Sequence, residues 1–419
     1  MQRRRHVALA QHLAKASAAA LVALGAFSAG CSSDDPADPP DDPADASDTA
    51  DPEDAGENGD VDAPEDHEVD FEIVAEELEH PWGMTFLPDG DALVTERPGR
   101  LNRVDLDTGD VTVIDEGPDD VFTPEGPGVQ GGLLDVELHP DFEDNRWVYL
   151  TYAGVVAGGQ ATHLGRGQLG GGALENFEIL HNVDPAIDAD RHFGSRVVFD
   201  DDGYVYYTTG DRGQRDPSQD RSNAIGTTLR LEDDGELPDD NPFVGEDDVE
   251  PYIYSYGHRN VQGMAVHPET GRIWQNEHGP SGGDEINLPE AGGNFGWPIA
   301  TYGVEYSGGD PIGDEPHEVD ETVDPIHHWE ARDSYAPSGM AFYEGDVFPA
   351  WEGDLFMGSL AKQYLSYFPV DGESVGDEQR LFEEQNWRVR AVEVGPDGYI
   401  YLLVDSGSAP LVRVVPADE

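Results

Sequence analysis

One histidine, His192, stands where it could remove a proton from a bound substrate. It lies in the stretch RHFGSRVVF, which begins at Arg191 and runs from a glycine-containing turn into an apolar strand. Imidazole has the side-chain pKa best suited to a general base near neutral pH, and catalytic groups are common on loops beside rigid elements. We therefore take His192 as a candidate base. The alternative is a loop histidine that hydrogen-bonds only backbone.

Three arginines in two other stretches could hold an anion or stabilise developing negative charge. Arg259 precedes Asn260 in the stretch GHRN, and Arg388 and Arg390 flank one valine in WRVR. Side chains two residues apart on a strand point to the same face, so Arg388 and Arg390 would repel unless an anion lay between them. An anionic ligand is the expectation. The alternatives are a structural salt bridge for Arg259 and ion pairs with surface carboxylates for the other two.

The elements that must position these residues are short β-strands. Beyond residue 70 the chain lacks long helical periodicity, and apolar runs alternate with Gly, Pro and Asp, which indicates antiparallel strands and turns. A hairpin unit recurs six times, starting at Gly83, Asp135, Arg196, Gly263, Gly339 and Val392. Separations of roughly fifty to seventy-five residues suit four-stranded blades whose apolar faces cover one another. The sequence predicts an all-β fold, a six-bladed β-propeller with four-stranded antiparallel blades over 71–419. A pair of β-sandwiches is the alternative.

Five stretches in this order resemble the soluble PQQ-dependent aldose (glucose/sorbosone-type) sugar dehydrogenase family, where PQQ is pyrroloquinoline quinone. They are QGGLLDVELHPDF, RHFGSRVVF, GHRNVQGMAVHP, NEHGPSGGDEINLPEAGGNFGWP and WRVRAVEVGPDG, beginning at Gln130, Arg191, Gly257, Asn276 and Trp387. The resemblance runs from about Pro81 to the C-terminus. It implies oxidation of an aldose at C1 to the aldonolactone, with hydride transfer to PQQ and electrons passed to an external acceptor.

The resemblance also implies a role for each candidate residue. His192 would be the general base, and the Arg259 guanidinium would stabilise negative charge that develops on the cofactor. The residues implied to bind PQQ are Gln130, Arg259, Asn260, Lys362, Arg388 and Arg390. The family lysine directly follows a Gly-small-Leu triplet, whereas here Ala361 stands before Lys362. A shift by one residue reverses a side chain's direction on a strand, so Lys362 is a ligand only if a bulge restores its direction.

Calcium is implied twice by the same resemblance. The carbonyl oxygens of Gly279 and Pro280 would bind the ion that also contacts PQQ. Glu285 and the carbonyl of Phe295 would bind a second, structural ion. For Glu285 the alternative is one more surface acid in a chain rich in acids.

The N-terminal segments indicate export. Basic residues precede a short apolar run, 17–30, that ends at Cys31, the only cysteine. This pattern resembles a lipoprotein signal peptide over 1–30 with lipidation at Cys31, and an ordinary signal peptide is the alternative. Residues 31–70 are acidic and proline-rich, which predicts a disordered tether. The expected location is periplasmic or at the cell surface, with the lipid anchor as the only membrane contact.

The net charge narrows the classes of partner. At −65, the chain would repel nucleic acid, and a surface so rich in acids suggests adaptation to high salt, although an acidic protein from a moderate habitat is the alternative. The expected partners are a small sugar and an external electron acceptor. The competing functions are oxidation of a sorbosone-like aldehyde or a polyol, binding of sugar or protein without redox chemistry, and a calcium-dependent lactonase.

Overall fold

A computed structural model describes residues 68–124, 126 and 128–417. The predicted signal peptide, Cys31 and nearly all of the predicted tether lie outside the described residues. The first strand begins at Val69, two residues before the predicted start of the propeller. Within the described ranges, no helix is long and apolar enough to cross a membrane.

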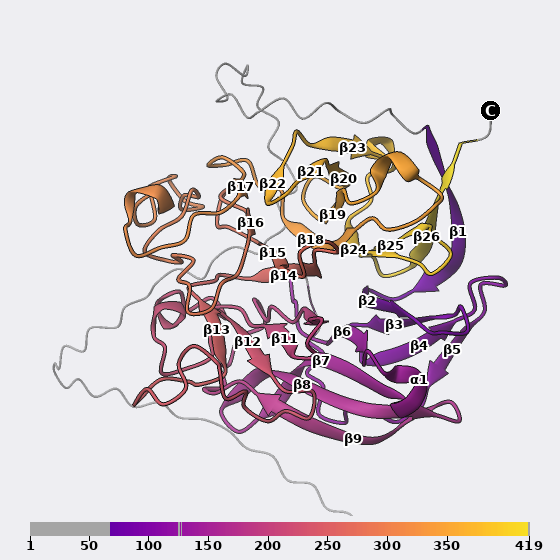
Figure 1. Ribbon diagram of the computed structural model, residues 1–419, viewed down its shortest axis with the longest axis horizontal. Helices are drawn as coiled ribbons and strands as arrows, with labels where there is room; N and C mark the ends of the chain where they lie inside the picture. The colour runs from indigo at the N-terminus through magenta and orange to yellow at the C-terminus, as the bar shows by residue number, and fades with distance from the viewer. Residues whose placement is uncertain (1–67, 125, 127, 418–419) are drawn as a thin grey trace, which may run out of the picture. The chain divides into compact units, whose positions relative to one another are not determined.

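The described residues form six four-stranded antiparallel sheets, which are the blades of a β-propeller (Figure 1). The first contains β2 (Pro81–Phe86), β3 (Ala92–Glu96), β4 (Arg100–Val104) and β5 (Val111–Ile114). The second contains β6 (Leu133–Leu138), β7 (Trp147–Val156), β8 (Gly159–Gly170) and β9 (Ala173–Asn182). The third contains β10 (Val197–Phe199), β11 (Val205–Thr208), β12 (Thr227–Leu231) and β13 (Ile253–Tyr256). The predicted all-β, six-bladed fold is confirmed.

The remaining blades follow the same order along the chain. The fourth contains β14 (Val261–Val266), β15 (Ile273–Glu277), β16 (Glu285–Asn287) and β17 (His327–His328). The fifth contains β18 (Pro337–Phe342), β19 (Leu355–Ser359), β20 (Leu365–Phe368) and β23 (Gln379–Leu381). The sixth contains β24 (Val389–Val394), β25 (Ile400–Val404), β26 (Ala409–Pro416) and β1 (Val69–Leu78). Short elements fill the connections: α1 (Phe142–Asn145), η1 (Asp216–Gln219), η2 (Pro316–Glu318), η3 (Pro349–Trp351), η4 (Glu383–Gln385), β21 (Val370–Asp371) and β22 (Ser374–Val375).

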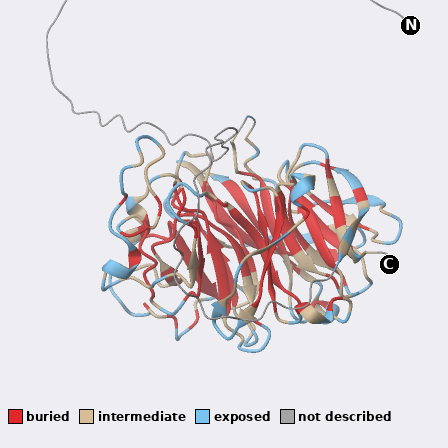
Figure 2. Ribbon diagram, turned by 90° about the horizontal axis from the view of Figure 1, so that it is seen from above, coloured by how far each residue is buried: buried red, intermediate tan, exposed pale blue. Residues whose placement is uncertain are grey.

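The sixth blade closes the ring because β1, from the start of the described chain, pairs with β26 near its end. The innermost strands β2, β6, β10, β14, β18 and β24 contact one another in sequence, and β24 contacts β2 again. Closure leaves no open edge between the first and last blades. Buried residues fill the inner strands of the blades, whereas the outer strands β5, β9 and β1 are largely part-exposed or exposed, as are many of the loops (Figure 2).

Glycine lets the innermost strands approach one another. A Cβ on Gly83 would lie 2.5 Å from an Asp135 carboxylate oxygen, and one on Gly263 would lie 2.2 Å from the Ser338 carbonyl oxygen. A Cβ on Gly339 would lie 2.7 Å from Ala391 Cα. These are the small residues that open three of the predicted hairpin units, so the repeat marks the strands around the propeller axis.

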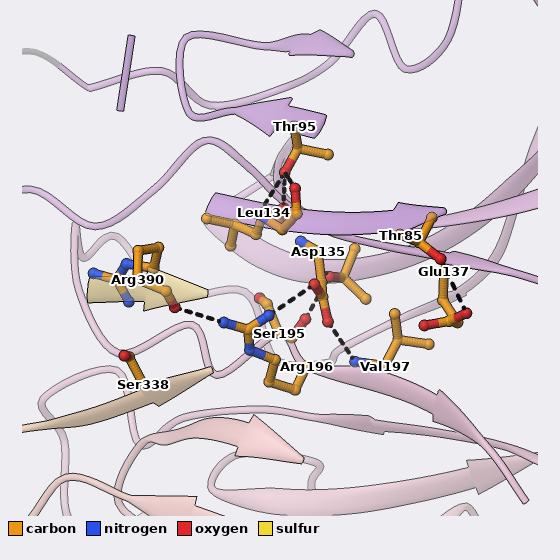
Figure 3. A network of polar contacts seen from close by, with 12 residues as sticks. Thr85, Thr95, Leu134, Asp135, Glu137, Ser195, Arg196, Val197, Ser338 and Arg390 are labelled. Atoms are coloured by element: carbon orange, nitrogen blue, oxygen red, sulfur yellow. Dashed lines mark hydrogen bonds and ion pairs between the residues drawn. The ribbon is translucent and has the colours of Figure 1, made fainter. Parts of the chain in front are cut away.

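A buried ion pair joins the blades at the axis (Figure 3). Arg196 Nη1 donates to Asp135 Oδ1 at 3.0 Å, its Nε donates to the Gln262 carbonyl at 2.6 Å, and its Nη2 donates to the Arg390 carbonyl at 3.1 Å. Its guanidinium also lies 4.2 Å from the centre of the Trp82 ring. One side chain thus links residues from five blades, and it lines the smaller of two cavities, of about 400 Å³.

Candidate active site

The larger cavity, about 670 Å³, lies at one end of the axis. The loops and strand ends that line it bring together residues far apart in sequence: Trp82, Arg97, Gln130, Phe193, Gly194, Gln262, His278, Leu360, Arg388, Arg390 and Asp405. Of the predicted site residues, Gln130, Arg388 and Arg390 line the cavity directly. The predicted residues His192, Arg259 and Asn260 are buried and adjoin residues that line the cavity. His192 precedes Phe193, Arg259 donates to the His278 carbonyl, and Asn260 accepts from the Gly194 N–H.

His192 is held from both its backbone and its ring. Its backbone N–H donates to Gln130 Oε1 at 2.7 Å, and its Nδ1 lies 2.6 Å from Asp211 Oδ1. The other carboxylate oxygen of Asp211 accepts from Trp297 Nε1 at 2.8 Å. A carboxylate at Nδ1 fixes the tautomer in which Nε2 is the nitrogen that accepts a proton, and it stabilises the imidazolium that results. The loop histidine is therefore built into a dyad and does not merely bond backbone.

The charge state of Asp211 suits this role. Complete burial by itself would raise the pKa of the carboxyl, but His192, Arg259 and the Gly213 N–H outweigh it and hold the pKa below its usual value. Asp211 therefore stays ionised beside the histidine. Asp211 was not among the predicted site residues, although its position at a glycine turn directly after a predicted strand was a signal that could have identified it.

Arg259 and Asn260 lie beside the dyad. The Asp211 N–H donates to the Arg259 carbonyl at 2.8 Å, and the Arg259 guanidinium donates to the His278 carbonyl at 3.3 Å and to the Tyr306 hydroxyl at 3.2 Å. Asn260 Oδ1 accepts from the Gly194 N–H at 3.2 Å, while its buried Nδ2 has no hydrogen-bond partner among the described residues. An amide donor buried without a partner is costly, so Asn260 fits a position that contacts a ligand.

Arg388 and Arg390 face the cavity together, as predicted, but they have a carboxylate neighbour that the sequence did not reveal. Asp405 Oδ2 lies 3.7 Å from Arg388 Nη2 and 3.8 Å from Arg390 Nη2. Burial lowers the pKa of Arg390 to about 9 although Asp405 opposes the shift. Burial alone would raise the pKa of Asp405, but a hydrogen bond from His80 and the nearby arginines hold it well below its usual range. Asp405 directly follows β25 and its side chain is only 10% exposed, so it differs from the surface carboxylates that were the alternative partners for these arginines.

The structure does not bring Lys362 to the cavity. β19 ends at Ser359, and Lys362 lies in the bend before β20 with Nζ bonded to Asp333. Its side chain is 37% exposed. Because Lys362 lies beyond the end of the strand, the alternation of side chains along β19 does not set its direction, and Lys362 is not among the residues that line the cavity. Leu360 does line the cavity, and its carbonyl accepts from Arg388 Nη1 at 2.9 Å.

Glu285 is buried in the fourth blade, so the surface-acid alternative is wrong. Burial, with the charge of Glu277 next, raises the pKa of Glu285 well above its ordinary value. Asn287 Nδ2 donates to both carboxylates at 3.2 Å. Glu285 is thus a buried oxygen donor of the kind that calcium prefers, whereas Glu277 is already bonded to His258 Nδ1 and to the Arg259 N–H, each at 2.7 Å.

The other predicted calcium ligands lie on loops of the same blade. The Gly279 N–H donates to Asp284 Oδ1 at 2.8 Å, and a Cβ on Gly279 would lie 2.2 Å from the Gly282 and Gly283 carbonyl oxygens. Phe295 stacks on His258, whose Nδ1 bonds to Glu277 at 2.7 Å. Among the described residues, no three His, Cys, Asp or Glu side chains are grouped to hold a metal, so ligation here would rely on backbone carbonyls.

Residues 78–413 match the protein family described as Glucose / Sorbosone dehydrogenase. The chain is 41% identical over 352 residues to aldose sugar dehydrogenase YliI of Escherichia coli K12, a match that covers 83% of this chain and 93% of that protein. The crystal structure of the soluble aldose sugar dehydrogenase of E. coli in the apo form superposes with a TM-score of 0.79, covering 83% of this chain and 100% of that one at 41% identity. The PQQ-bound aldose sugar dehydrogenase of Streptomyces coelicolor has a TM-score of 0.66 at 30% identity, covering 84% of this chain and 100% of that one.

Proposed function

Because the chain belongs to the glucose/sorbosone dehydrogenase family and is an oxidoreductase acting on sugars, we propose that it is PQQ- and calcium-dependent. It oxidises an aldose at C1 to the aldonolactone and passes the electrons to an external acceptor. The observation that carries the proposal is the His192–Asp211 dyad, which adjoins an arginine-lined cavity.

The residues present fit PQQ. A tricarboxylate needs local positive charge in a chain of net charge −65, and Arg388 and Arg390 supply it at the cavity wall. The buried Nδ2 of Asn260 and Nε of Arg390 have no hydrogen-bond partners among the described residues, so each is a donor for a polar ligand. Gln130 would hold the cofactor from the loop that also binds the His192 backbone. When bound, PQQ supplies the two-electron acceptor.

Residues of the chain take up the proton that the substrate loses in the reaction. His192 Nε2 takes the proton of the C1 hydroxyl while the C1 hydrogen leaves as hydride, so the C1–O bond becomes the lactone carbonyl. The Asp211 carboxylate accepts a hydrogen bond from the Nδ1–H of His192 and stabilises the resulting imidazolium. The lowered pKa of Asp211 keeps this carboxylate ionised. The buried Arg259 guanidinium places fixed positive charge beside the reacting groups, where little water screens it.

Calcium would be held by two sets of oxygens. The Gly279 and Pro280 carbonyls would bind one ion at the cofactor, and Glu285 with the Phe295 carbonyl would bind another. Supporting the second site, the raised pKa of Glu285 reflects a buried carboxylate beside Glu277, and a divalent cation would remove that repulsion.

Reconstitution tests the function. Purified chelator-treated protein should reduce a dye with aldoses when PQQ and Ca²⁺ are both added, and should do so only weakly when either is withheld. A sorbosone-like aldehyde and a polyol in the same panel test the competing substrates. PQQ binding without oxidation of any sugar would contradict the proposal and favour a propeller that binds sugar or a protein partner without redox chemistry.

We also propose export and anchoring through a lipid on Cys31, supported by the basic residues, apolar run and single cysteine at the N-terminus. Cys31→Ser in the full-length chain should move the protein from the membrane fraction to the soluble fraction, as followed by immunoblotting. A Ser32→Ala variant is the matched control and should stay with membranes. Membrane retention of Cys31→Ser would contradict the anchor.

A further inference from the structure

We propose that Arg97, outside every motif noted in the sequence, is a cofactor-binding residue that supplies the cationic contact Lys362 does not make. The inference rests on the proposed use of PQQ. Among the described residues that line the cavity, the arginines are Arg97, Arg388 and Arg390, and Lys362 is not part of the lining.

The fold fixes the position of Arg97 rigidly. Arg97 lies in the turn after β3, where its N–H donates to the His80 carbonyl at 3.1 Å and its carbonyl accepts from the Leu133 N–H at 3.3 Å. Gly132 packs so closely that a Cβ there would lie 2.3 Å from the Arg97 carbonyl oxygen. The Arg97 side chain is 16% exposed, and its Nη1 donates to the Val129 carbonyl at 2.5 Å, beside Gln130. A guanidinium held this way loses little freedom when a ligand binds.

Three guanidinium groups converge on one carboxylate. Arg97 Nη2 lies 3.7 Å from Asp405 Oδ1, which also bonds to His80 Nδ1 at 2.8 Å. Arg388 and Arg390 approach the other carboxylate oxygen, Oδ2, at 3.7 and 3.8 Å. Charge-assisted hydrogen bonds are shorter, about 2.7–2.9 Å, so Asp405 attracts these three nitrogens without closing such a bond to any of them.

Positive charge is concentrated around Asp405. Three guanidinium groups face this one carboxylate in a chain whose net charge is −65, and Glu79, the other carboxylate among the described residues that line the cavity, pairs with Arg100 at 2.8 Å. The mutual repulsion of the three guanidinium groups contributes to the lowered pKa of Arg390, after burial as the larger cause and against the opposing effect of Asp405. An anion with several carboxylates relieves that repulsion, and Arg97 extends the cationic wall to the first blade, where the two predicted arginines do not reach.

The test is PQQ binding to the apoprotein, followed by quenching of tryptophan fluorescence at constant Ca²⁺, since Trp82 lines the same cavity. Arg97→Gln should raise the PQQ Kd about tenfold or more, the effect of one charge-assisted contact. Lys362→Gln should leave Kd within about twofold of wild type. The matched control is Arg103→Gln, which removes a first-blade arginine that pairs with Asp89 and Asp91 outside the cavity and should also leave Kd unchanged.

Circular dichroism and the thermal midpoint of the apoprotein establish that each variant is folded. If Arg97→Gln does not fold, Arg97→Met, which keeps most of the aliphatic part of the side chain, is tested instead. It should raise the PQQ Kd by the same factor. An Arg97 variant that binds PQQ as tightly as Arg103→Gln, while wild type binds, overturns this inference and leaves the proposed function intact. Failure of the wild type to bind PQQ overturns the proposed function and this inference with it.

Discussion

His192→Asn is expected to lower kcat for sugar oxidation by about 10²–10⁴, the usual contribution of a general base, while the PQQ Kd stays within a few-fold of wild type. The reason is the geometry of the dyad: Asp211 orients Nδ1 so that Nε2 takes the proton, and an amide cannot take it. Asparagine is the replacement of choice because His192 has φ of 52°, a region that Asn enters more readily than most residues. Steady-state dye reduction with saturating PQQ and Ca²⁺ measures the effect.

His267→Asn is the matched control, since His267 is also buried but packs against Trp274 and Phe342 in the fourth and fifth blades. It should change stability more than kcat. If kcat of His192→Asn stays within tenfold of wild type, His192 is not the general base.

Arg196→Met is expected to lower the free energy of unfolding by about 3–5 kcal/mol, because it leaves the buried Asp135 carboxylate without its charged partner. The two side chains are only 4% and 7% exposed, and the pair lies at the axis where the blades meet (Figure 3). Urea denaturation at fixed salt and pH 7 measures the change. Arg103→Met, which breaks exposed pairs with Asp89 and Asp91, should cost no more than about 1 kcal/mol.

The effect of Arg196→Met should also depend on pH in a definite direction. Burial already raises the pKa of Asp135 in the folded chain, and Arg196 is the main opposing influence. Without Arg196, the pKa of Asp135 in the folded chain rises further. The loss in the free energy of unfolding is then largest at pH values where Asp135 is ionised in the unfolded chain. The difference in free energy of unfolding between Arg196→Met and wild type should therefore shrink as pH falls toward the range in which Asp135 is protonated. The double variant Asp135→Asn, Arg196→Met should recover part of the loss at pH 7, and a deficit below 1 kcal/mol in the single variant would contradict the argument.

The sequence by itself determined the blades and much of the site. Hairpin units with two-residue alternation and Pro, Asp or Gly turns are local patterns, so each could be identified without knowing what packs against it. The small residues Gly83, Gly263 and Gly339 fall on the innermost strands because only glycine permits that approach. His192, Arg259, Asn260 and Gln130 lie in motifs that the fold brings together at one cavity or next to residues that line it.

Only the tertiary structure decided which groups that are separated along the chain meet. Closure by β1 against β26 joins the two ends of the described chain, and no local pattern specifies it. Asp211 reaches His192 from the next turn of its blade, while Arg97 and Asp405 come to the cavity from the first and sixth blades. Lys362 is the opposite case. Its position in the sequence suggested a cation that binds the cofactor, but it lies beyond the end of β19 and its Nζ bonds to Asp333. Side chains at strand ends take their direction from turn conformation and from the neighbouring blade, and ring closure sets both.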